Sequence, residues 1–399
     1  MSDRTIRDKT AIAGVGRTPY WRRGQSEPRT RFELACQAIL AAVEDAGLEV
    51  RDVDGFALYS GGGGFDPGMA AQVLGIPDVR FTAGLTGGGG GAAGAIGLAA
   101  AAITGGLADV VVSLMVLQQP SAGRFGSAFA NKGGQYSAPP TPEKDFLAPS
   151  GLVGPGQMFA ILMQRHMHQY GTTREHLAEV AISTRTNALN RPQALMRNPM
   201  TRDDYFAARM IADPFCLFDF CLECDGAVAV VTTTAERARD LRHPPAYVRA
   251  SAFGGAGDWG TAITWMGMPE AIFASSGHRP VARDLWARAG LGPQDVDVAL
   301  LYDHFSGLVL LQLEDYGFCP FGESGPFVSD GNIRFDGGSV PVNTHGGNLS
   351  EAYIIGFSHV MEAVEQLRGT AVNQVPDASV ALVTGGPAPI PVSGLVLVK

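Results

Sequence analysis

A run of five glycines, Gly87 to Gly91, stands directly before an alanine-rich segment with the composition of a buried helix. Glycines at the start of a helix can present backbone N–H groups to an anion, or can form a turn that carries a catalytic side chain. The run lacks the Gly-Lys-Ser/Thr ending of a phosphate-binding loop. Nucleotide binding is therefore disfavoured, while close helix packing, room for a substrate or a catalytic turn without its side chain stay open.

A second group of chemically capable residues lies in the last hundred residues. Tyr302, Asp303 and His304 stand together in the stretch YDHF, and His345 opens the stretch HGGNLSEAY, which ends at Tyr353. Phenol and imidazole groups can act as general acids or bases once their pKa values are matched to the task. Each residue also has a plainer interpretation, because an aromatic or histidine side chain in an apolar segment is often part of the core.

The five cysteines do not form a metal framework or a disulfide pattern. Cys221 and Cys224 form a C-x-x-C pair, but no second pair at similar spacing supplies the other two ligands of a structural zinc site. Buried thiols in a reducing compartment are the expected state. We therefore predict no metal site.

Composition places the chain among globular proteins. Hydrophobic residues make up 46% and charged residues 17% of the 399 residues, which allows a large core. The net charge of −9 argues against nucleic acid as a partner. No apolar run is long enough to cross a membrane, and the charged N-terminus lacks the apolar core of a signal peptide. We expect a cytoplasmic protein that does not insert into membranes.

An internal repeat indicates the architecture. Residues 46–59, AGLEVRDVDGFALY, resemble residues 289–302, AGLGPQDVDVALLY, so that Tyr59 and Tyr302 correspond. In the first copy the glycine run leads into a helix to Ile103 and an apolar strand at 109–116. In the second, Gly346 and Gly347 lead into a helix to about Leu367 and a strand at 379–386. Apolar strands that alternate with helices predict an α/β protein with sheets covered on both faces.

The repeat suggests a division of the chain. We predict an N-terminal half formed by residues 1–116 and 216–250, and a C-terminal half formed by residues 251–399. Residues 117–215 do not match either copy; a polar, Gly/Pro-rich stretch precedes two helical patterns there. Long loops inside a compact chain are usually functional, so we interpret 117–215 as an inserted loop and cap region.

The order of these features resembles the thiolase superfamily, and most of all its branch of sterol-carrier and lipid-transfer proteins. The resemblance covers nearly the whole chain and rests on the repeat together with the stretches YGTTREHLAEVA, DGAVAVV, DVDVALLYDHF and VNTHGG. It implies the thiolase fold, in which two duplicated βαβαβ-type halves form αβαβα layers.

The reactive positions of thiolases are occupied by other residues here. The nucleophilic cysteine corresponds to Gly89, and the second cysteine corresponds to Val383 or Thr384. The polar residue of the Asn-Glu-Ala-Phe-like motif corresponds to Tyr302, and the histidine of the Gly-His-Pro motif corresponds to Tyr353. Without a thiol at these positions, catalysis through an acyl-cysteine intermediate is not available.

Loss of both cysteines and gain of two tyrosines resembles the lipid-transfer-protein-type aldolases of bacterial steroid side-chain degradation. The resemblance implies a retro-aldolase that cleaves the Cα–Cβ bond of a β-hydroxyacyl-CoA, a 17-hydroxy steroid with a C22 side chain, to a 17-ketosteroid and propionyl-CoA. It needs no cofactor beyond the coenzyme A of its substrate. The implied catalytic residues are Tyr302, Tyr353, His304 and Asp303, and the implied substrate-binding residues are Gly89, Gly346, Gly347 and His345.

Two alternatives stay open. A catalytically inactive thiolase fold that carries or scaffolds acyl-CoA or lipid would also lack the cysteines. A thiolase or synthase with another nucleophile, such as Thr86, would form a covalent adduct. For assembly, the resemblance implies a homodimer through the first half, with a small OB-fold accessory protein that would give a heterotetramer.

Overall fold

The computed structural model describes residues 5–59, 65–85, 89–119, 148–152, 154–255, 274–386 and 391–399. Thr86, the first two glycines of the run and most of the polar stretch at 118–155 lie outside these ranges. In the described part of the chain, no helix is long and apolar enough to cross a membrane.

One mixed sheet organises the molecule. Its strands follow the order β10-β11-β12-β9-β1-β8-β5-β3-β4, and β2 pairs with β8. The strands are β1 (Thr10–Arg17), β2 (Trp21–Arg22), β3 (Gly55–Tyr59), β4 (Phe81–Leu85), β5 (Val110–Leu117), β8 (Cys224–Thr234), β9 (Ala246–Gly254), β10 (Val298–Leu300), β11 (Val380–Gly385) and β12 (Val392–Val398). A separate hairpin joins β6 (Met210–Ala212) and β7 (Phe215–Cys216).

The two halves of the sheet have matching connectivity. β3 is parallel to its neighbour β5, as β10 is parallel to β11. β5 is antiparallel to β8, as β11 is antiparallel to β12. The halves meet where β1 pairs with β9 through Ala11 and Ile12. The correspondence of β3 with β10 and of β5 with β11 is the one that the internal repeat predicts. The expected boundary between residues 250 and 251 falls inside β9, whose register with β12 runs from Tyr247 to Gly254.

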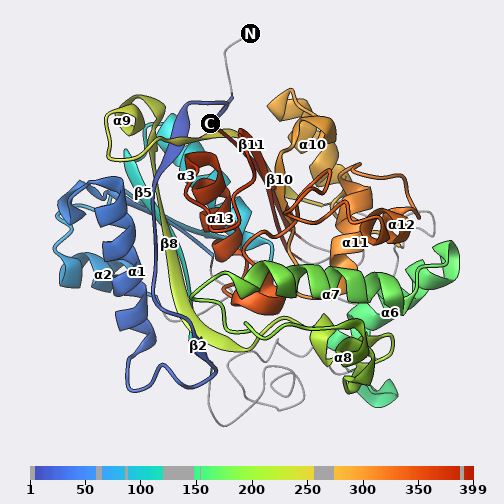
Figure 1. Cartoon of the computed structure of the whole chain (residues 1–399). Coiled ribbons are helices and arrows are strands. Elements are labelled where there is room, and N and C mark those ends of the chain that lie inside the picture. The colour runs from blue at the N-terminus through green and yellow to red at the C-terminus, as the bar shows by residue number, and fades with distance from the viewer. Residues whose placement is uncertain are drawn as a thin grey trace.

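Helices cover the sheet in layers. The main helices are α1 (Arg31–Ala46), α2 (Pro67–Leu74), α3 (Gly91–Thr104), α6 (Pro155–Tyr170), α7 (Arg174–Leu189), α8 (Arg202–Ala207), α9 (Ala235–Arg239), α10 (Arg279–Ala289), α11 (Ser306–Asp315), α12 (Ser324–Ser329) and α13 (Phe357–Arg368). α1 packs on β1 and β8, and α10 packs on β9 and β12. α3 contacts strands of both halves and lies beside α13 in the middle (Figure 1). The layered thiolase architecture expected from the sequence is confirmed.

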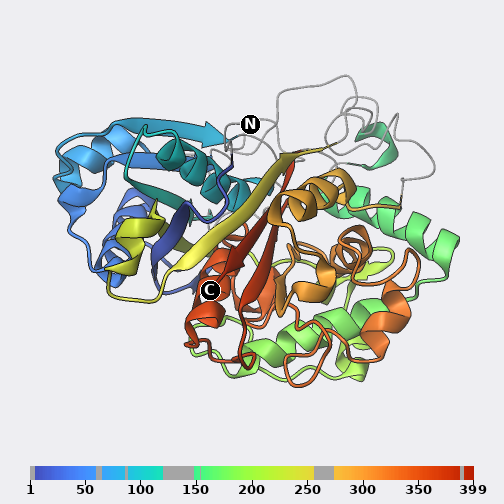
Figure 2. The same cartoon turned by 90° about the horizontal axis from the view of Figure 1, so that it is seen from above.

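The inserted region lies against the C-terminal half. In Figure 2 the yellow and red strands β9, β11 and β12 cross the molecule diagonally, and the green helices α6 and α7 lie on the far side from the blue N-terminal segments. α7 contacts α11 and α12, and α6 belongs to the same apolar cluster through Phe159 and Met163. This packing places Phe159 beside residues that follow β10.

The segment after Gly346 and Gly347 differs from the expected helix to Leu367. A short π-helix, Gly347–Glu351, is followed by an extended turn, and α13 begins only at Phe357. The helix is interrupted because Ile355 has a φ of 48° and Gly356 a φ of 80°, a left-handed conformation that a helix does not accommodate. The interruption leaves Tyr353 in the turn, where its side chain is not committed to a helix face.

Candidate active site

The phenol groups of Tyr302 and Tyr353 meet near the N-terminal end of α3. The Tyr302 and Tyr353 hydroxyl oxygens are 3.0 Å apart, and both side chains are buried. Tyr302 follows β10, and Tyr353 lies in the turn between the π-helix and α13. Burial, and after it the neighbouring Tyr353, raises the pKa of Tyr302 well above the usual value near 10. Tyr302 therefore keeps its proton at neutral pH and can donate it.

Gly89 and Gly91, at the start of α3, make room for the side chains of Tyr302 and Tyr59. A Cβ atom built on Gly89 would lie 2.0 Å from the Tyr302 hydroxyl oxygen, and one on Gly91 would lie 1.8 Å from the ring of Tyr59. Distances below 3.0 Å are incompatible with a real side chain, so both glycines are required by the tyrosines. The space that the sequence left for a bulky substrate at Gly89 is taken by the phenol of Tyr302.

Cys224 fixes the backbone of Tyr353. The Tyr353 N–H donates to the Cys224 sulfur at 3.2 Å, and the Cys224 thiol donates to the Tyr353 carbonyl at 3.4 Å. Burial raises the pKa of Cys224 to about 12, so that it stays a thiol. In the described part of the chain, no cluster of three His, Cys, Asp or Glu side chains could hold a metal ion. Sequence reasoning treated this cysteine as core and missed its contact with the candidate site.

His304 lies beside the tyrosine pair and has no hydrogen-bond partner among the described residues. Its ring centroid is 5.2 Å from that of Tyr302 and 4.6 Å from that of Phe159 on α6. Burial lowers the pKa of His304 to about 3, so the ring is neutral, and neither of its nitrogens is bonded within the structure. A neutral imidazole presents one donor and one acceptor, which leaves both available to a ligand.

Asp303 is bonded to the segment that carries Asn348, and its assignment as a catalytic residue stays a prediction. Its carboxylate accepts hydrogen bonds from the backbone N–H groups of Asn348 (2.9 Å) and Leu349 (3.3 Å) and contacts His359 Nε2 at 3.1 Å. A Cβ atom on Gly347 would lie 2.0 Å from the same carboxylate. Asp303 thus anchors the π-helix, and Gly347 gives it access.

Gly346 and His345 lie further along the same buried segment. A side chain on Gly346 would collide with Ala188 at the end of α7, where its Cβ would approach to 2.7 Å. The His345 ring centroid is 4.7 Å from that of His359, and burial lowers the pKa of His345 well below its usual value. The structure gives both residues packing contacts, so their assignment to substrate binding stays a prediction.

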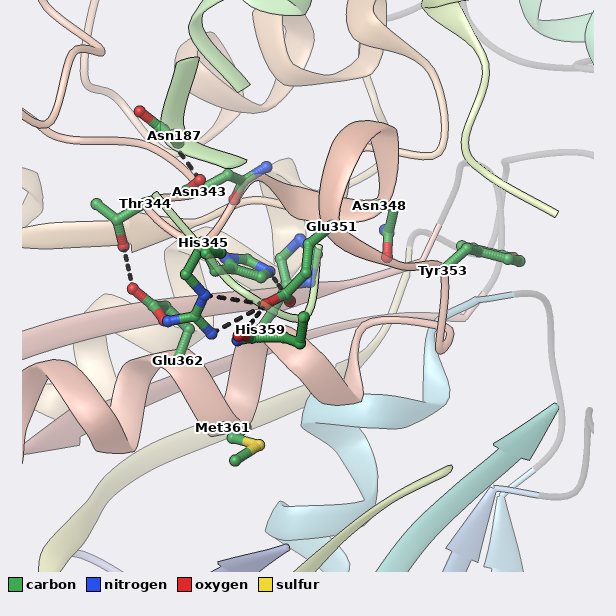
Figure 3. Close-up of polar contacts among 12 residues, drawn as sticks. Asn187, Asn343, Thr344, His345, Asn348, Glu351, Tyr353, His359, Met361 and Glu362 are labelled. Carbon is green, nitrogen blue, oxygen red and sulfur yellow. Dashed lines mark hydrogen bonds and ion pairs between the residues drawn. The ribbon is translucent and has the colours of Figure 1, made fainter. Parts of the chain in front are cut away.

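Asn348 is a functional candidate that the sequence did not reveal. Its side chain is fully buried, and neither its amide oxygen nor its amide nitrogen has a partner within the structure. Figure 3 shows Asn348 on the π-helix, on the side toward Tyr353. A buried amide without partners costs free energy, so such a group is normally retained for a ligand or an ordered water. No periodicity or motif in the sequence could have indicated this.

A buried ionic cluster contacts the π-helix through Glu351. Arg191, from the segment after α7, lies 2.9 Å from Glu351 and 2.9 Å from Glu362, and 3.1 Å from Glu365. Thr344 donates a hydrogen bond to Glu362 at 2.6 Å, as the dashed line in Figure 3 marks. This cluster connects the inserted region to α13.

Comparison with known proteins places the chain in a family. Residues 264–390 match the family model described as thiolase C-terminal domain-like. A steroid side-chain-cleaving aldolase of Thermomonospora curvata is 40% identical over 97% of both chains. A 17-hydroxy-3-oxo-4-pregnene-20-carboxyl-CoA lyase of Mycobacterium tuberculosis is 38% identical over 98% of this chain and 99% of that protein.

Solved structures give the same result. A structure described as "Ltp2-ChsH2(DUF35) aldolase" has a TM-score of 0.90 and 39% identity, with 99% of each chain covered. A monomeric SCP2-thiolase-like protein of Mycobacterium smegmatis has a TM-score of 0.71 at 18% identity, covers 98% of this chain and 77% of that one, and shows the fold alone. With its fold and its full-length relatives in agreement, the chain belongs to the thiolase superfamily, in the sterol-carrier-protein-like branch that includes the steroid side-chain-cleaving aldolases.

Proposed function

We propose that this protein is a retro-aldolase that cleaves the Cα–Cβ bond of a β-hydroxyacyl-CoA. The substrate is a 17-hydroxy steroid with a C22 side chain carried as a CoA thioester, and the products are a 17-ketosteroid and propionyl-CoA. The printed activities of the two relatives at 40% and 38% identity support this substrate class. The observation that carries the proposal is the direct contact of the Tyr302 and Tyr353 hydroxyl groups at 3.0 Å.

The reaction needs one proton removed and one proton delivered. When the Cα–Cβ bond breaks, the β-hydroxyl loses its proton and becomes the ketone, and the bonding electrons pass to the thioester enolate. The α-carbon of that enolate then takes up a proton. We assign Tyr302, which keeps its proton, as the donor to the α-carbon. Tyr353 enters the step as a phenolate that accepts the hydrogen bond of Tyr302, and it takes up the hydroxyl proton. Their hydrogen bond lets the proton that Tyr353 gains replace the one that Tyr302 gives.

Neutral hydrogen-bond donors would serve the thioester oxygen. Its developing negative charge needs donors that are already oriented and shielded from water. His304 and Asn348, both buried and without partners within the structure, are suited to this task, and Asp303 contributes by fixing the π-helix that carries Asn348.

The protein is proposed to act as a homodimer and with a second protein. The printed description of one solved relative names two components, Ltp2 and ChsH2(DUF35), which supports an accessory partner of the kind that the resemblance implies, a small OB-fold protein. β4 stands at the end of the sheet and pairs only with β3 among the described strands, which supports association through the first half.

Incubation with the 17-hydroxy C22 steroid CoA thioester tests the proposal. Mass spectrometry should detect the 17-ketosteroid and propionyl-CoA in equal amounts, with no covalent adduct on the intact protein. Binding of the thioester without products, in the presence and absence of the accessory protein, would instead indicate an inactive carrier. A stable acyl adduct would indicate a nucleophile such as Thr86 and would contradict the proposal.

A further inference from the structure

The backbone of Tyr302 is held on both sides by one closed ring of hydrogen bonds. The Tyr302 N–H donates to the Thr384 hydroxyl oxygen at 2.8 Å, and that hydroxyl donates to the Gln312 amide oxygen at 2.6 Å. The Gln312 amide nitrogen donates to the Tyr302 carbonyl at 2.9 Å. The three residues come from three elements: β11, α11 and the end of β10.

The ring is rigid because it is buried and fully satisfied. Tyr302, Gln312 and Thr384 are each at most 1% exposed, so water does not compete for these bonds. Gln312 is also tied to its own helix, since its amide nitrogen donates to the Leu308 carbonyl at 2.8 Å. Every donor and acceptor in the ring has one orientation that satisfies it.

The far end of the side chain is confined by glycines. The Tyr302 hydroxyl lies against Gly89, and a Cβ atom on Gly356 would be 3.1 Å from the Tyr302 ring. These glycines provide space but supply no polar contact to direct the ring. The hydrogen bond to the Tyr353 hydroxyl at 3.0 Å and the ring at the backbone therefore fix the direction of the side chain together. A small rotation at the Cα atom would be carried along the length of the side chain to the hydroxyl.

We propose that Thr384 and Gln312 are positioning residues that hold the Tyr302 phenol at its reacting position. The inference rests on the proposed function of Tyr302 and adds how that function is maintained. Displacement of a catalytic group by about 1 Å can cost about 100-fold in rate. The ring thus acts on turnover rather than on binding of the thioester.

The test compares two isosteric substitutions. Thr384→Val removes the hydroxyl of the ring and keeps the volume. Thr184→Val is the matched control, because Thr184 on α7 is also buried and its hydroxyl donates to the Val180 and Ala181 carbonyls of its own helix. We expect kcat to fall about 10- to 100-fold in Thr384→Val, with KM nearly unchanged, and to stay near wild type in Thr184→Val. Thr384→Ser, which restores the hydroxyl, should recover most of the rate.

A double mutant shows whether the effect passes through Tyr302. In a Tyr302→Phe background, Thr384→Val should cause no further loss, because the group that it positions is already gone. Loss of equal size in both backgrounds, or equal loss in Thr184→Val, would overturn the inference. If Tyr302→Phe itself keeps wild-type activity, the proposed function fails instead. Gln312→Leu, which opens the same ring from α11, decides the question by the same criteria if Thr384→Val does not fold.

Discussion

The Tyr302 hydroxyl stands where a side chain on Gly89 would have to begin, 2.0 Å from the position of its Cβ atom. A side chain at position 89 and the phenol of Tyr302 therefore exclude one another. In the thiolase pattern the first of these positions carries the nucleophile, whereas here it is vacated for a phenol delivered from the other half of the chain. Under the proposed function, this exchange would replace covalent chemistry with proton transfer at the N-terminal end of α3.

Substitution of Gly89 should abolish activity without creating a thiolase. Gly89→Ala and Gly89→Cys both force Tyr302 away from Tyr353, so we expect turnover of the steroid thioester to fall by at least about 100-fold. The cysteine variant should show no CoA-dependent thiolysis, because Tyr353 occupies the place of the activating histidine. Thiolysis assays and retro-aldol assays on the same preparations measure both effects. CoA-dependent thiolysis by Gly89→Cys would contradict the assignment of this turn.

Removal of either phenolic hydroxyl should stop the chemistry and spare the fold. Tyr302→Phe and Tyr353→Phe should lower kcat by about 10²- to 10⁴-fold and lower the free energy of unfolding by about 1–2 kcal/mol. Tyr205→Phe is the control, since Tyr205 lies in the inserted region and its buried hydroxyl donates to Asp219 at 2.8 Å. Tyr59 is a poorer control because its ring packs on Gly91 of the same turn. Both site variants retaining more than about a tenth of the wild-type rate would be inconsistent with the mechanism.

Replacement of Asn348 should separate stability from activity. Asn348→Leu removes a buried amide whose oxygen and nitrogen both lack partners in the described part of the chain, so the free energy of unfolding should rise, by about 1 kcal/mol or more. Turnover should fall if the amide binds the thioester oxygen. Thermal melts and steady-state kinetics on the same variant provide the two measurements. A variant that is less stable and fully active would show that Asn348 serves only the fold.

Buried neutral histidines predict a loss of stability in mild acid. The pKa is lowered to about 3 for His304 and to about 4 for His278, mainly by burial. An unfolded histidine titrates near 6.5, so below that pH the unfolded state binds the proton first and unfolding is favoured by up to about 1.4 kcal/mol per pH unit for each group. This stabilisation is fully present above pH 6.5 and declines as the pH falls toward 3.

A histidine variant isolates that contribution. Buried carboxyl groups with raised pKa values, such as Asp219 and Asp315, take up protons in the folded state and act in the opposite direction. The slope of unfolding free energy against pH should therefore be compared between wild type and His304→Phe. Between pH 6.5 and 5 we expect this slope to be smaller in the variant by up to about 1.4 kcal/mol per pH unit, which corresponds to one proton. Identical slopes would mean that His304 is accessible to protons in the folded protein.

The edge of the sheet predicts the oligomeric state. An uncovered edge strand favours pairing with another chain, and C2 dimers are the commonest closed assembly. Sedimentation at micromolar concentration should give a dimer, and Thr82→Lys, which adds charge to the exposed position of β4, should shift it toward the monomer. A wild-type chain that sediments as a monomer across this range would exclude the dimer.

Much of the architecture was accessible from the sequence because it follows from local patterns. The repeat at 46–59 and 289–302 identified β3 and β10 as equivalent strands, and the apolar runs located β5 and β11 to within one residue. The helix before Leu367 was predicted too long. Its interruption at Ile355 depends on a left-handed backbone conformation that a non-glycine residue adopts only in a particular tertiary context.

The candidate site was predictable only in part. Position in the family pattern pointed to Tyr302 and Tyr353, but nothing local indicated that their hydroxyl groups would meet. His359 carries no sequence signal, yet its ring contacts Asp303 inside the protein. Asn348 and Gln312 carry no sequence signature at all, because their importance lies in which atoms are left unpaired or bonded after three distant segments come together.

The buried ionic cluster around Arg191 limits which segments of this protein could be deleted or exchanged with those of a homologue. Glu351 on the π-helix and Glu362 and Glu365 on α13 share one guanidinium group, that of Arg191 from the inserted region, and only Glu365 is also paired with Arg17 among the described ion pairs. A chain lacking that region would bury negative charge without compensation, at a cost of several kcal/mol. The insertion is thus not an exchangeable module grafted onto an independent scaffold, and homologous caps could be transplanted only together with the acidic residues that receive them.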